Sequence, residues 1–287
     1  MNKSRFEKLV VIGAGTMGIG IAEVFAAAGR DVKVVEVNEQ VFRNAVEGLK
    51  KRLQKRVESG KVKQEFAENL LSRIRYVPNI RKLTDADLVI EAIIEKLDAK
   101  QNVFRELAEV TSPETILASN TSSLSITSIA SAVRHPKRVM GIHFFNPAPR
   151  MPLVEVVPGA ETDLSLAEEV KGWLKKLGKE PVIVKDTPGF LVNRVARPFH
   201  LEAYRYVQDQ IASKEQVDRI MRTAGFKMGP FELQDLIGID INFAASVSVF
   251  EGNFYEARYR PHPLQRQMVE QGAIGRKAGK GHYSYEK

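Results

Sequence analysis

Two residues on neighbouring apolar runs could carry out acid-base chemistry. His143 ends one run, within His143-Phe144-Phe145-Asn146-Pro147, and Glu155 lies in the next, at residues 153–157. A proline-rich segment around residue 149 separates them and could reverse the chain. In that case the two side chains face one another, and the carboxylate orients the imidazole and makes it a stronger base. A lone strand histidine is as often structural, so at this point both interpretations stand.

A glycine-rich segment indicates a dinucleotide site. Gly13-Ala14-Gly15-Thr16-Met17-Gly18 follows the apolar run 9–12 and opens an alanine-rich helical pattern. Glycines at these positions allow a tight turn, close approach of a pyrophosphate and close packing of helix on strand. Glu36 ends the next apolar run, where a carboxylate can bind the ribose hydroxyls and repel a 2′-phosphate. The segment therefore favours NAD over NADP.

Other polar residues lie where an open α/β sheet places ligands. Asn120-Thr121-Ser122-Ser123 directly follows the apolar run 115–118, and its hydroxyls could bind substrate or cap the next helix. Asn193 lies beside the expected domain boundary, where it could face a cleft or be only a polar helix residue. The other four histidines, His135, His200, His262 and His282, lack metal-ligand spacing, so we expect no metal site.

Apolar runs that alternate with helical patterns must position these residues. The expected strands are 9–12, 32–35, 88–91, 115–118, 138–142, 153–157 and 181–184. They predict an α/β fold, a Rossmann-type doubly wound and mainly parallel sheet, over residues 1–185. A basic helical hairpin at about 39–75 interrupts this pattern, with its turn near 59–60. Residues 186–287 are predicted to form a smaller all-helical domain, with helices at 190–206, at 214–223 and up to 237.

Composition narrows the class of protein. The 287 residues include no cysteine, which excludes disulfides and thiolate metal sites and fits the cytoplasm. The net charge is +8, but basic and acidic residues are interspersed and no nucleic-acid-binding motif occurs, so we expect no nucleic-acid partner. The apolar stretch 9–29 contains five glycines and is typical of a strand, a turn and a helix, so we expect no membrane span.

Several segments, in order along almost the whole chain, resemble the 3-hydroxyacyl-CoA dehydrogenase family. Besides the glycine loop and the segment that begins at His143, they are Glu91-Ala92-Ile93-Ile94-Glu95, Ser119-Asn120-Thr121-Ser122-Ser123-Leu124, Asp186-Thr187-Pro188-Gly189-Phe190-Leu191-Val192-Asn193-Arg194, Met228-Gly229-Pro230-Phe231-Glu232-Leu233 and Gly275-Arg276-Lys277.

The resemblance implies a role for each of these sites. His143 would remove the proton of the substrate's 3-hydroxyl while hydride passes to NAD, and Glu155 would orient and charge the imidazole. Ser122 and Asn193 would position the substrate hydroxyl and the thioester carbonyl. The helical second domain would bind substrate and form a homodimer. With those expected from the glycine motif, the residues that would contact NAD are Gly13, Ala14, Gly15, Thr16, Met17, Gly18, Glu36, Glu95, Lys100, Ser122 and Asn146.

The chain departs from the family pattern at three places. His282 stands where the family usually has phenylalanine, in Gly281-His282-Tyr283. Arg52 and Ser59 occupy positions where a serine and a lysine would contact coenzyme A. The hairpin offers other cations, Lys51, Lys55 and Lys61, which could bind the acidic nucleotide end or simply form a solvated helix face.

The expected reaction is NAD-dependent oxidation of an (S)-3-hydroxyacyl-CoA to the 3-oxoacyl-CoA, with a short acyl group such as 3-hydroxybutyryl, in fatty-acid or related metabolism. One alternative is a dehydrogenase for a dicarboxylic thioester such as 3-hydroxyadipyl-CoA, or for a free hydroxy acid. An arginine near the acyl end, Arg150 or Arg197, would be diagnostic of that substrate. The other is a non-catalytic cofactor-binding protein, like the λ-crystallin of the lens, which resembles this family.

Overall fold

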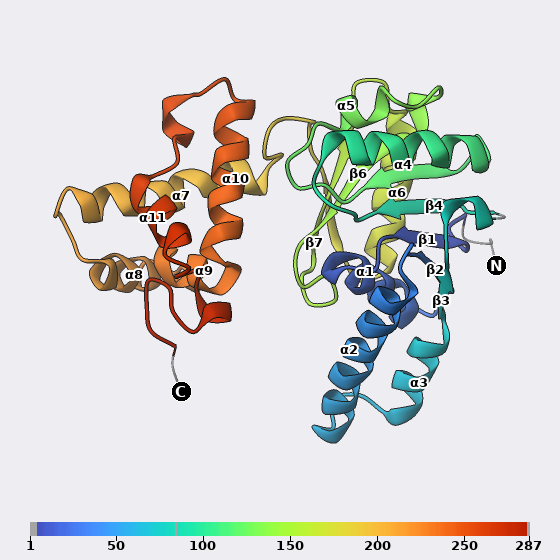
Figure 1. Ribbon diagram of the computed structural model, residues 1–287, viewed down its shortest axis with the longest axis horizontal. Helices are drawn as coiled ribbons and strands as arrows, with labels where there is room; N and C mark the ends of the chain where they lie inside the picture. Colours follow the sequence, from blue (N-terminus) through green and yellow to red (C-terminus); the bar gives the residue numbers. More distant parts are fainter. Residues whose placement is uncertain (1–4, 84, 286–287) are drawn as a thin grey trace. The chain divides into compact units, whose positions relative to one another are not determined.

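The protein divides into two units, Met1–Asp186 and Thr187–Lys287 (Figure 1). The computed structural model describes residues 5–83 and 85–285. The first unit contains a sheet with helices on it, and the second is built from helices. This is the predicted fold class, which is confirmed.

The described residues form one sheet of eight strands. The strands are β1 (Leu9–Ile12), β2 (Val32–Val35), β3 (Ile74–Val77), β4 (Leu88–Glu91), β5 (Ile116–Ser119), β6 (Val139–Phe144), β7 (Leu153–Pro158) and β8 (Glu180–Ile183). Their order is β3-β2-β1-β4-β5-β6-β7-β8. All neighbours are parallel except β6 and β7, which are antiparallel. Most of these strands are apolar along their whole length because helices cover both faces of the sheet.

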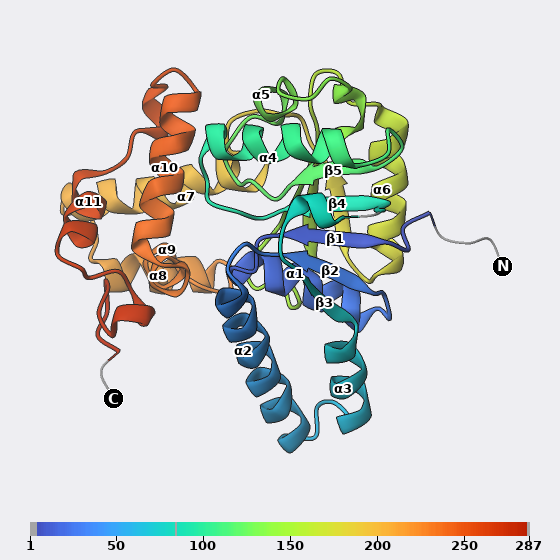
Figure 2. The same cartoon turned by 45° about the vertical axis from the view of Figure 1, so that its right-hand side comes forward.

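Helices connect the parallel strands. Those of the first unit are α1 (Thr16–Ala27), α2 (Glu39–Glu58), α3 (Gln64–Ser72), α4 (Leu97–Val110), α5 (Ile126–Ala130) and α6 (Leu164–Lys176). Figures 1 and 2 show α4 on one face of the sheet, α6 on the other, and the α2–α3 hairpin extending away from it. Short 3₁₀ turns lie at Ile80–Lys82 and Pro136–Arg138.

The predicted end of the hairpin was wrong. We expected helix up to residue 75, but α3 ends at Ser72 and Ile74–Val77 forms the edge strand β3, paired with β2. Arg73 and Arg75 continue the charged pattern of the hairpin and hide the short strand. The pairing is decided by tertiary contact with β2, which local sequence does not reveal.

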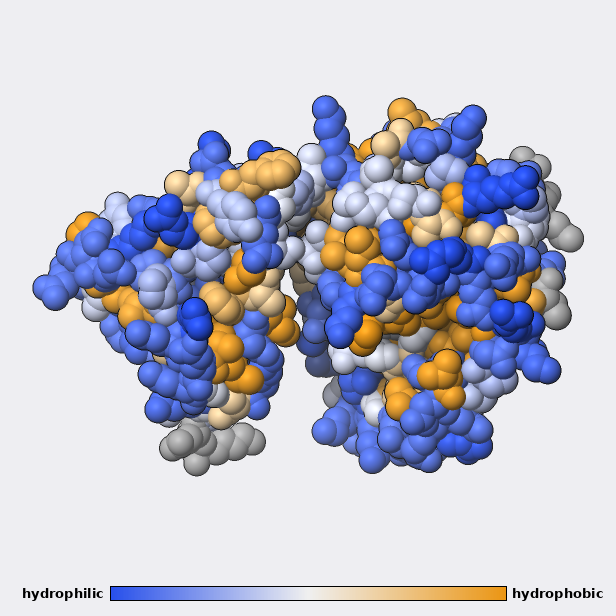
Figure 3. Space-filling view, turned by 45° about the horizontal axis from the view of Figure 1, so that its top comes forward, coloured by the Kyte–Doolittle hydropathy of each residue, from blue (hydrophilic) through white to orange (hydrophobic). Residues whose placement is uncertain are grey.

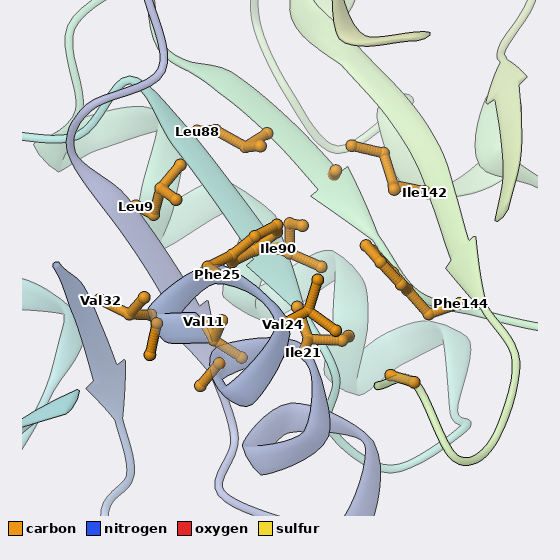
Figure 4. Packing of buried hydrophobic residues seen from close by; sticks show 14 of the residues in the cluster. Leu9, Val11, Ile21, Val24, Phe25, Val32, Leu88, Ile90, Ile142 and Phe144 are labelled. Atoms are coloured by element: carbon orange, nitrogen blue, oxygen red, sulfur yellow. The ribbon is translucent and has the colours of Figure 1, made fainter. Parts of the chain in front are cut away.

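A core of aliphatic and aromatic side chains holds α1 and α6 on the sheet. The Phe25 ring of α1 lies 5.2 Å from the Trp173 ring of α6 and 6.1 Å, edge to face, from the Phe144 ring of β6. In Figure 4 side chains of α1 lie against β1, β4 and β6; the labelled ones are Ile21, Val24, Phe25, Leu9, Val11, Leu88, Ile90, Ile142 and Phe144. This packing fixes the strand ends that carry the polar residues.

The second unit is all-helical within its described residues. Its helices are α7 (Val192–Gln208), α8 (Lys214–Thr223), α9 (Pro230–Ile237), α10 (Ile239–Gly252) and α11 (Pro263–Glu270), with 3₁₀ turns at Ala257–Tyr259 and Arg276–Ala278. Ser213 and Gln216 form a capping box that begins α8. The first helix starts two residues later than predicted, because Phe190 has a positive φ of 47°. Sequence analysis did not predict α10 and α11.

The surfaces of both units are mixed. Figure 3 shows hydrophilic residues over much of the visible face of each unit, with hydrophobic residues among them. Among the described residues no single helix is long and apolar enough to cross a membrane. The pair α9 and α10, bent by 103°, passes that test by length and composition alone.

Candidate active site

The glycine loop forms a tight turn between β1 and α1. Gly13 has φ +97°, and its amide donates to the carbonyl of Val35 in β2 at 2.8 Å. A Cβ at Gly13 would lie 2.8 Å from the carbonyl oxygen of Ala92, and a Cβ at Gly18 would overlap the carbonyl of Gly13. A Cβ at Gly15, the N-cap of α1, would meet nothing within 4 Å. The open face is therefore at the helix N-terminus, where a pyrophosphate binds in Rossmann folds.

Glu36 lies at the carboxyl end of β2, beside this loop. Its Oε2 accepts from the Ala14 amide at 3.0 Å, and its Oε1 accepts from the Asn38 amide at 3.1 Å. The carboxylate is thereby fixed at the loop, in the position expected of a ribose-binding acid. The first turn of α1 contains Thr16 and Met17 and no acidic residue, so no side-chain charge there opposes a phosphate. These residues fit NAD.

His143 and Glu155 form a buried pair between β6 and β7. The antiparallel register places the two residues opposite one another, with Glu155 Oε2 2.7 Å from His143 Nδ1. Their side chains are 7% and 1% exposed. The predicted fold-back and contact are confirmed. A histidine held by a carboxylate through one ring nitrogen has a fixed orientation.

The end of β6 is held by the loop that follows β5. The Asn120 side-chain oxygen accepts from the Phe144 amide at 2.8 Å, and the Phe145 ring lies 4.4 Å from that of His143. Asn146 is exposed and precedes a cis peptide bond to Pro147. The structure thus places Asn146 three residues beyond the histidine, in the reversal between β6 and β7.

Glu95 organises the serine loop. Its Oε1 accepts from the Thr121 hydroxyl at 2.6 Å, the Ser122 amide at 3.0 Å and the Ser123 hydroxyl at 3.0 Å. Burial raises the pKa of Glu95, but the Lys100 charge and these hydrogen bonds outweigh burial and lower it below its usual value. Glu95 therefore remains a carboxylate and fixes Ser122. The helix cap comes from Ser125, whose hydroxyl accepts from the Ser128 amide.

Lys100, which the resemblance makes a contact of NAD, is buried. Its side chain is 1% exposed, and its Nζ lies 2.6 Å from Glu91 and 3.2 Å from Glu95. Glu91 also accepts from the Ile93 amide and the Ser119 hydroxyl, both at 2.7 Å. Lys100 thus links the end of β4 to the serine loop. Sequence analysis missed Glu91 as the anchor, although an acid that ends an apolar strand is a visible signal.

The hairpin lysines are exposed. Lys51 and Lys55 lie on α2, and Lys61 lies in the turn that follows it. Arg52, where the family pattern has a serine, lies 3.2 Å from Glu23, a buried carboxylate of α1. Arg52 thus ties the hairpin to α1. Lys51 lies 4.0 Å from Glu47, and Lys55 and Lys61 are exposed where an anionic ligand could reach them.

Asn193 belongs to the second unit, in the first turn of α7. Four residues further along the helix, Arg197 donates through Nε to the carbonyl oxygen of Asn193 at 3.1 Å. Arg150, the other arginine considered for the acyl end, is exposed. In the described part of the chain no group of three or more potential ligands could hold a metal ion.

Together, the glycine loop, Glu36 and the doubly wound sheet define an NAD-binding Rossmann domain. The model of the 3-hydroxyacyl-CoA dehydrogenase NAD-binding domain matches residues 8–187, and that of the C-terminal domain of the same family matches residues 189–285. The chain belongs to the 3-hydroxyacyl-CoA dehydrogenase family, a family of NAD-dependent oxidoreductases.

Known relatives cover almost the whole chain. It is 46% identical over 97% of its length to the 3-hydroxyadipyl-CoA dehydrogenase of Escherichia coli, of which it spans 59%. It is 42% identical over 98% of its length to the 3-hydroxybutyryl-CoA dehydrogenase of Clostridioides difficile, of which it spans 100%. The crystal structure of an Escherichia coli 3-hydroxybutyryl-CoA dehydrogenase matches with a TM-score of 0.94 at 46% identity, over 98% of this chain and 60% of that one.

Proposed function

We propose that the protein oxidises (S)-3-hydroxyacyl-CoA thioesters to 3-oxoacyl-CoA with NAD. The buried pair of His143 and Glu155 carries this proposal, because it supplies a base on the same sheet as the NAD-binding loop. Family membership supports the thioester substrate. Because the pair is intact, we favour an enzyme over a non-catalytic protein of the λ-crystallin kind.

In this proposal His143 takes the proton of the 3-hydroxyl. Nδ1 faces Glu155, so Nε2 is the atom that accepts the substrate proton, and Glu155 stabilises the charge that develops on the ring. Bound NAD supplies the hydride acceptor. Ser122, held by Glu95, and Asn193 orient the hydroxyl and the thioester carbonyl. Orienting the substrate lowers the barrier without forming a bond.

The hairpin is proposed to bind coenzyme A. The exposed cations Lys51, Lys55 and Lys61 would attract its phosphates. A hollow of about 500 Å³ in the same hairpin is lined by Arg56, Val62, Lys63, Glu65, Phe66 and Asn69. An apolar ring flanked by cations suits an adenine nucleotide.

The acyl group is proposed to be short. Relatives named for 3-hydroxybutyryl-CoA, among them that of Clostridioides difficile, support a four-carbon substrate. The 46% identity to a 3-hydroxyadipyl-CoA dehydrogenase supports a short dicarboxylic acyl group as a second candidate. We further propose a cytoplasmic homodimer, with residues 186–287 as the substrate and dimerisation domain, on the basis of the family resemblance and the lack of cysteine.

A nicotinamide absorbance assay tests the proposal. The purified protein is mixed with acetoacetyl-CoA and NADH, and parallel reactions replace NADH by NADPH or the thioester by free acetoacetate. We expect rapid loss of NADH with the thioester only, and much slower loss of NADPH because Glu36 repels its 2′-phosphate. Turnover of free acetoacetate at the same rate would contradict the coenzyme A requirement. If the protein turned over neither acetoacetyl-CoA nor any longer or dicarboxylic thioester, the proposed dehydrogenase activity would be contradicted.

A further inference from the structure

Arg197 is a buried cation inside the helical second unit. It is 3% exposed, and its described hydrogen bonds all go to neutral acceptors. Nε donates to the carbonyl of Asn193, and Nη1 donates to the carbonyl of Asn242 at 2.8 Å and the hydroxyl of Ser246 at 3.1 Å. Arg197 therefore spans α7 and α10 while keeping its full charge.

No carboxylate among residues 5–83 and 85–285 forms an ion pair with Arg197. Lys100 is paired with Glu91, and Glu23 with Arg52, whereas the buried Arg138 and Lys179, like Arg197, donate only to neutral oxygens. Burial lowers the pKa of Arg197 to about 10, so the guanidinium is still protonated at neutral pH. A buried charge without a counterion is costly, and an anionic ligand that reached Arg197 would offset that cost.

An unsatisfied donor lies beside Arg197. Asn242 accepts from Arg197 through Oδ1, while its Nδ2 is buried with no hydrogen-bond partner among the described residues. His200, one turn after Arg197, has a pKa lowered to about 3 by burial and then by the Arg197 charge, so it remains neutral. The surroundings of the Arg197 guanidinium are therefore positively charged, and its hydrogen-bond acceptors carry no negative charge. A carboxylate would complement this environment.

We propose that Arg197 binds a carboxylate at the far end of the acyl chain, so that the protein accepts short dicarboxylic 3-hydroxyacyl-CoA thioesters. The proposal rests on the function above, in which Asn193 contacts the thioester. Arg197 lies one helical turn from Asn193 and is bonded to its backbone, so both residues lie along the same side of α7. Arg150 is the weaker candidate because water already solvates its exposed charge.

The test compares two thioesters of equal chain length. kcat/KM is measured for reduction of 3-oxoadipyl-CoA and of 3-oxohexanoyl-CoA, which differ only in a terminal carboxylate or methyl group. In Arg197→Met the ratio of these two values should fall by about ten- to hundredfold, the worth of a lost charge-assisted hydrogen bond. Arg205→Met, on the same helix but paired with Glu202 at the surface, should leave the ratio unchanged. A folded Arg197→Met with the wild-type ratio would overturn the proposal.

A measurement on the wild-type protein covers the case in which Arg197→Met does not fold. Binding of adipyl-CoA and hexanoyl-CoA, which lack the reacting oxygen, is compared by calorimetry. We expect at least tenfold tighter binding of adipyl-CoA. Equal affinities would overturn the carboxylate site while turnover of acetoacetyl-CoA persisted. Loss of turnover with every thioester would instead overturn the dehydrogenase function itself.

Discussion

The hydrogen bond between Glu155 and His143 identifies His143 as the residue to test as the general base. Replacing His143 by alanine removes the group that accepts the proton, so kcat should fall by about two to four orders of magnitude. NAD affinity should change little, because the glycine loop and Glu36 lie on other strands. Steady-state kinetics with acetoacetyl-CoA and NADH titration by fluorescence measure the two effects. A wild-type kcat would show that another residue is the base.

Glu155 should act through His143 and not on the substrate. Glu155→Gln keeps the shape of the side chain but removes the charge that stabilises the imidazolium, so kcat should fall about ten- to hundredfold. KM for the thioester should stay within about threefold. The pH profile of kcat should also shift, which a purely structural defect would not produce. If Glu155→Gln left both kcat and its pH dependence unchanged, the charge of the Glu155 carboxylate would have no role in the reaction.

Sequence reasoning reached this pair but missed Glu91, the anchor of Lys100, for a physical reason. Two strands joined by a short reversal have few possible registers, so His143 and Glu155 could be matched by counting from residue 149. The network around Lys100 depends on how a helix places its first turn over two strand ends. No local pattern reports that distance, and a lysine in a polar segment is usually solvated.

At the scale of elements, the junction of β1 with α1 depends on Gly18. A methyl group there would overlap the Gly13 carbonyl, so Gly18→Ala should lower the free energy of unfolding by about 1–3 kcal/mol and weaken NAD binding. Gly172→Ala is the matched control, since it lies within α6 and its Cβ would meet nothing within 4 Å. It should stabilise the protein by about 0.5–1 kcal/mol. Urea unfolding of both variants checks the sign; a stable Gly18→Ala would contradict the packing argument.

The hairpin is the element through which coenzyme A binding can be tested. Reversing two exposed charges, as in Lys55→Glu with Lys61→Glu, should raise KM for acetoacetyl-CoA about three- to tenfold. The effect should shrink at high salt because exposed charges are screened. Lys175→Glu with Lys176→Glu, a double reversal of two exposed lysines at the end of α6, is the matched control. If the hairpin variant and the α6 control had the same KM for acetoacetyl-CoA, coenzyme A would bind somewhere other than the hairpin.

Elements were predictable where periodicity is strong. The strands β1 and β2 match the expected ranges 9–12 and 32–35, because fully apolar runs between helices have one interpretation in a parallel sheet. The strand β3 has a partly exposed, charged sequence and was taken for helix. The helix α10 buries polar residues such as Asn242 and Ser246, so its pattern carries no clear apolar face.

At the scale of the whole molecule, the two units differ in how they use buried polar groups. In the first unit the buried glutamates pair with basic groups, as in Glu91 with Lys100 and Glu155 with His143. In the second unit histidines and amides such as His200, His282 and Gln234 are buried beside the charged residues Arg197, Asp218 and Asp235. His282 contacts the Tyr204 hydroxyl at 2.9 Å, and its backbone amide donates to Asp235. The second unit should therefore respond to acid more sharply.

At His282 the folded state binds fewer protons than the unfolded chain does in mild acid. Burial, reinforced by the Lys214 charge and opposed by Asp235, lowers the pKa of His282 to about 4, whereas an unfolded histidine titrates near about 6.5. The stability contributed by keeping this ring neutral is complete above pH about 6.5 and is lost as the pH falls toward 4. Allowing for residual solvation, the loss between pH 7 and pH 5 is about 1–2 kcal/mol.

Replacing His282 by the phenylalanine usual in the family should remove this loss. Urea unfolding at pH 7 and pH 5 should give a difference that is about 1–2 kcal/mol smaller in His282→Phe than in the wild type. At pH 7 the variant should differ little, because Tyr204 keeps its hydrogen bond to Gln234 at 3.1 Å. His135→Phe, at an exposed site of the first unit, should keep the wild-type difference. If His282→Phe also kept it, other groups of the second unit, His200 first among them, would govern the acid sensitivity.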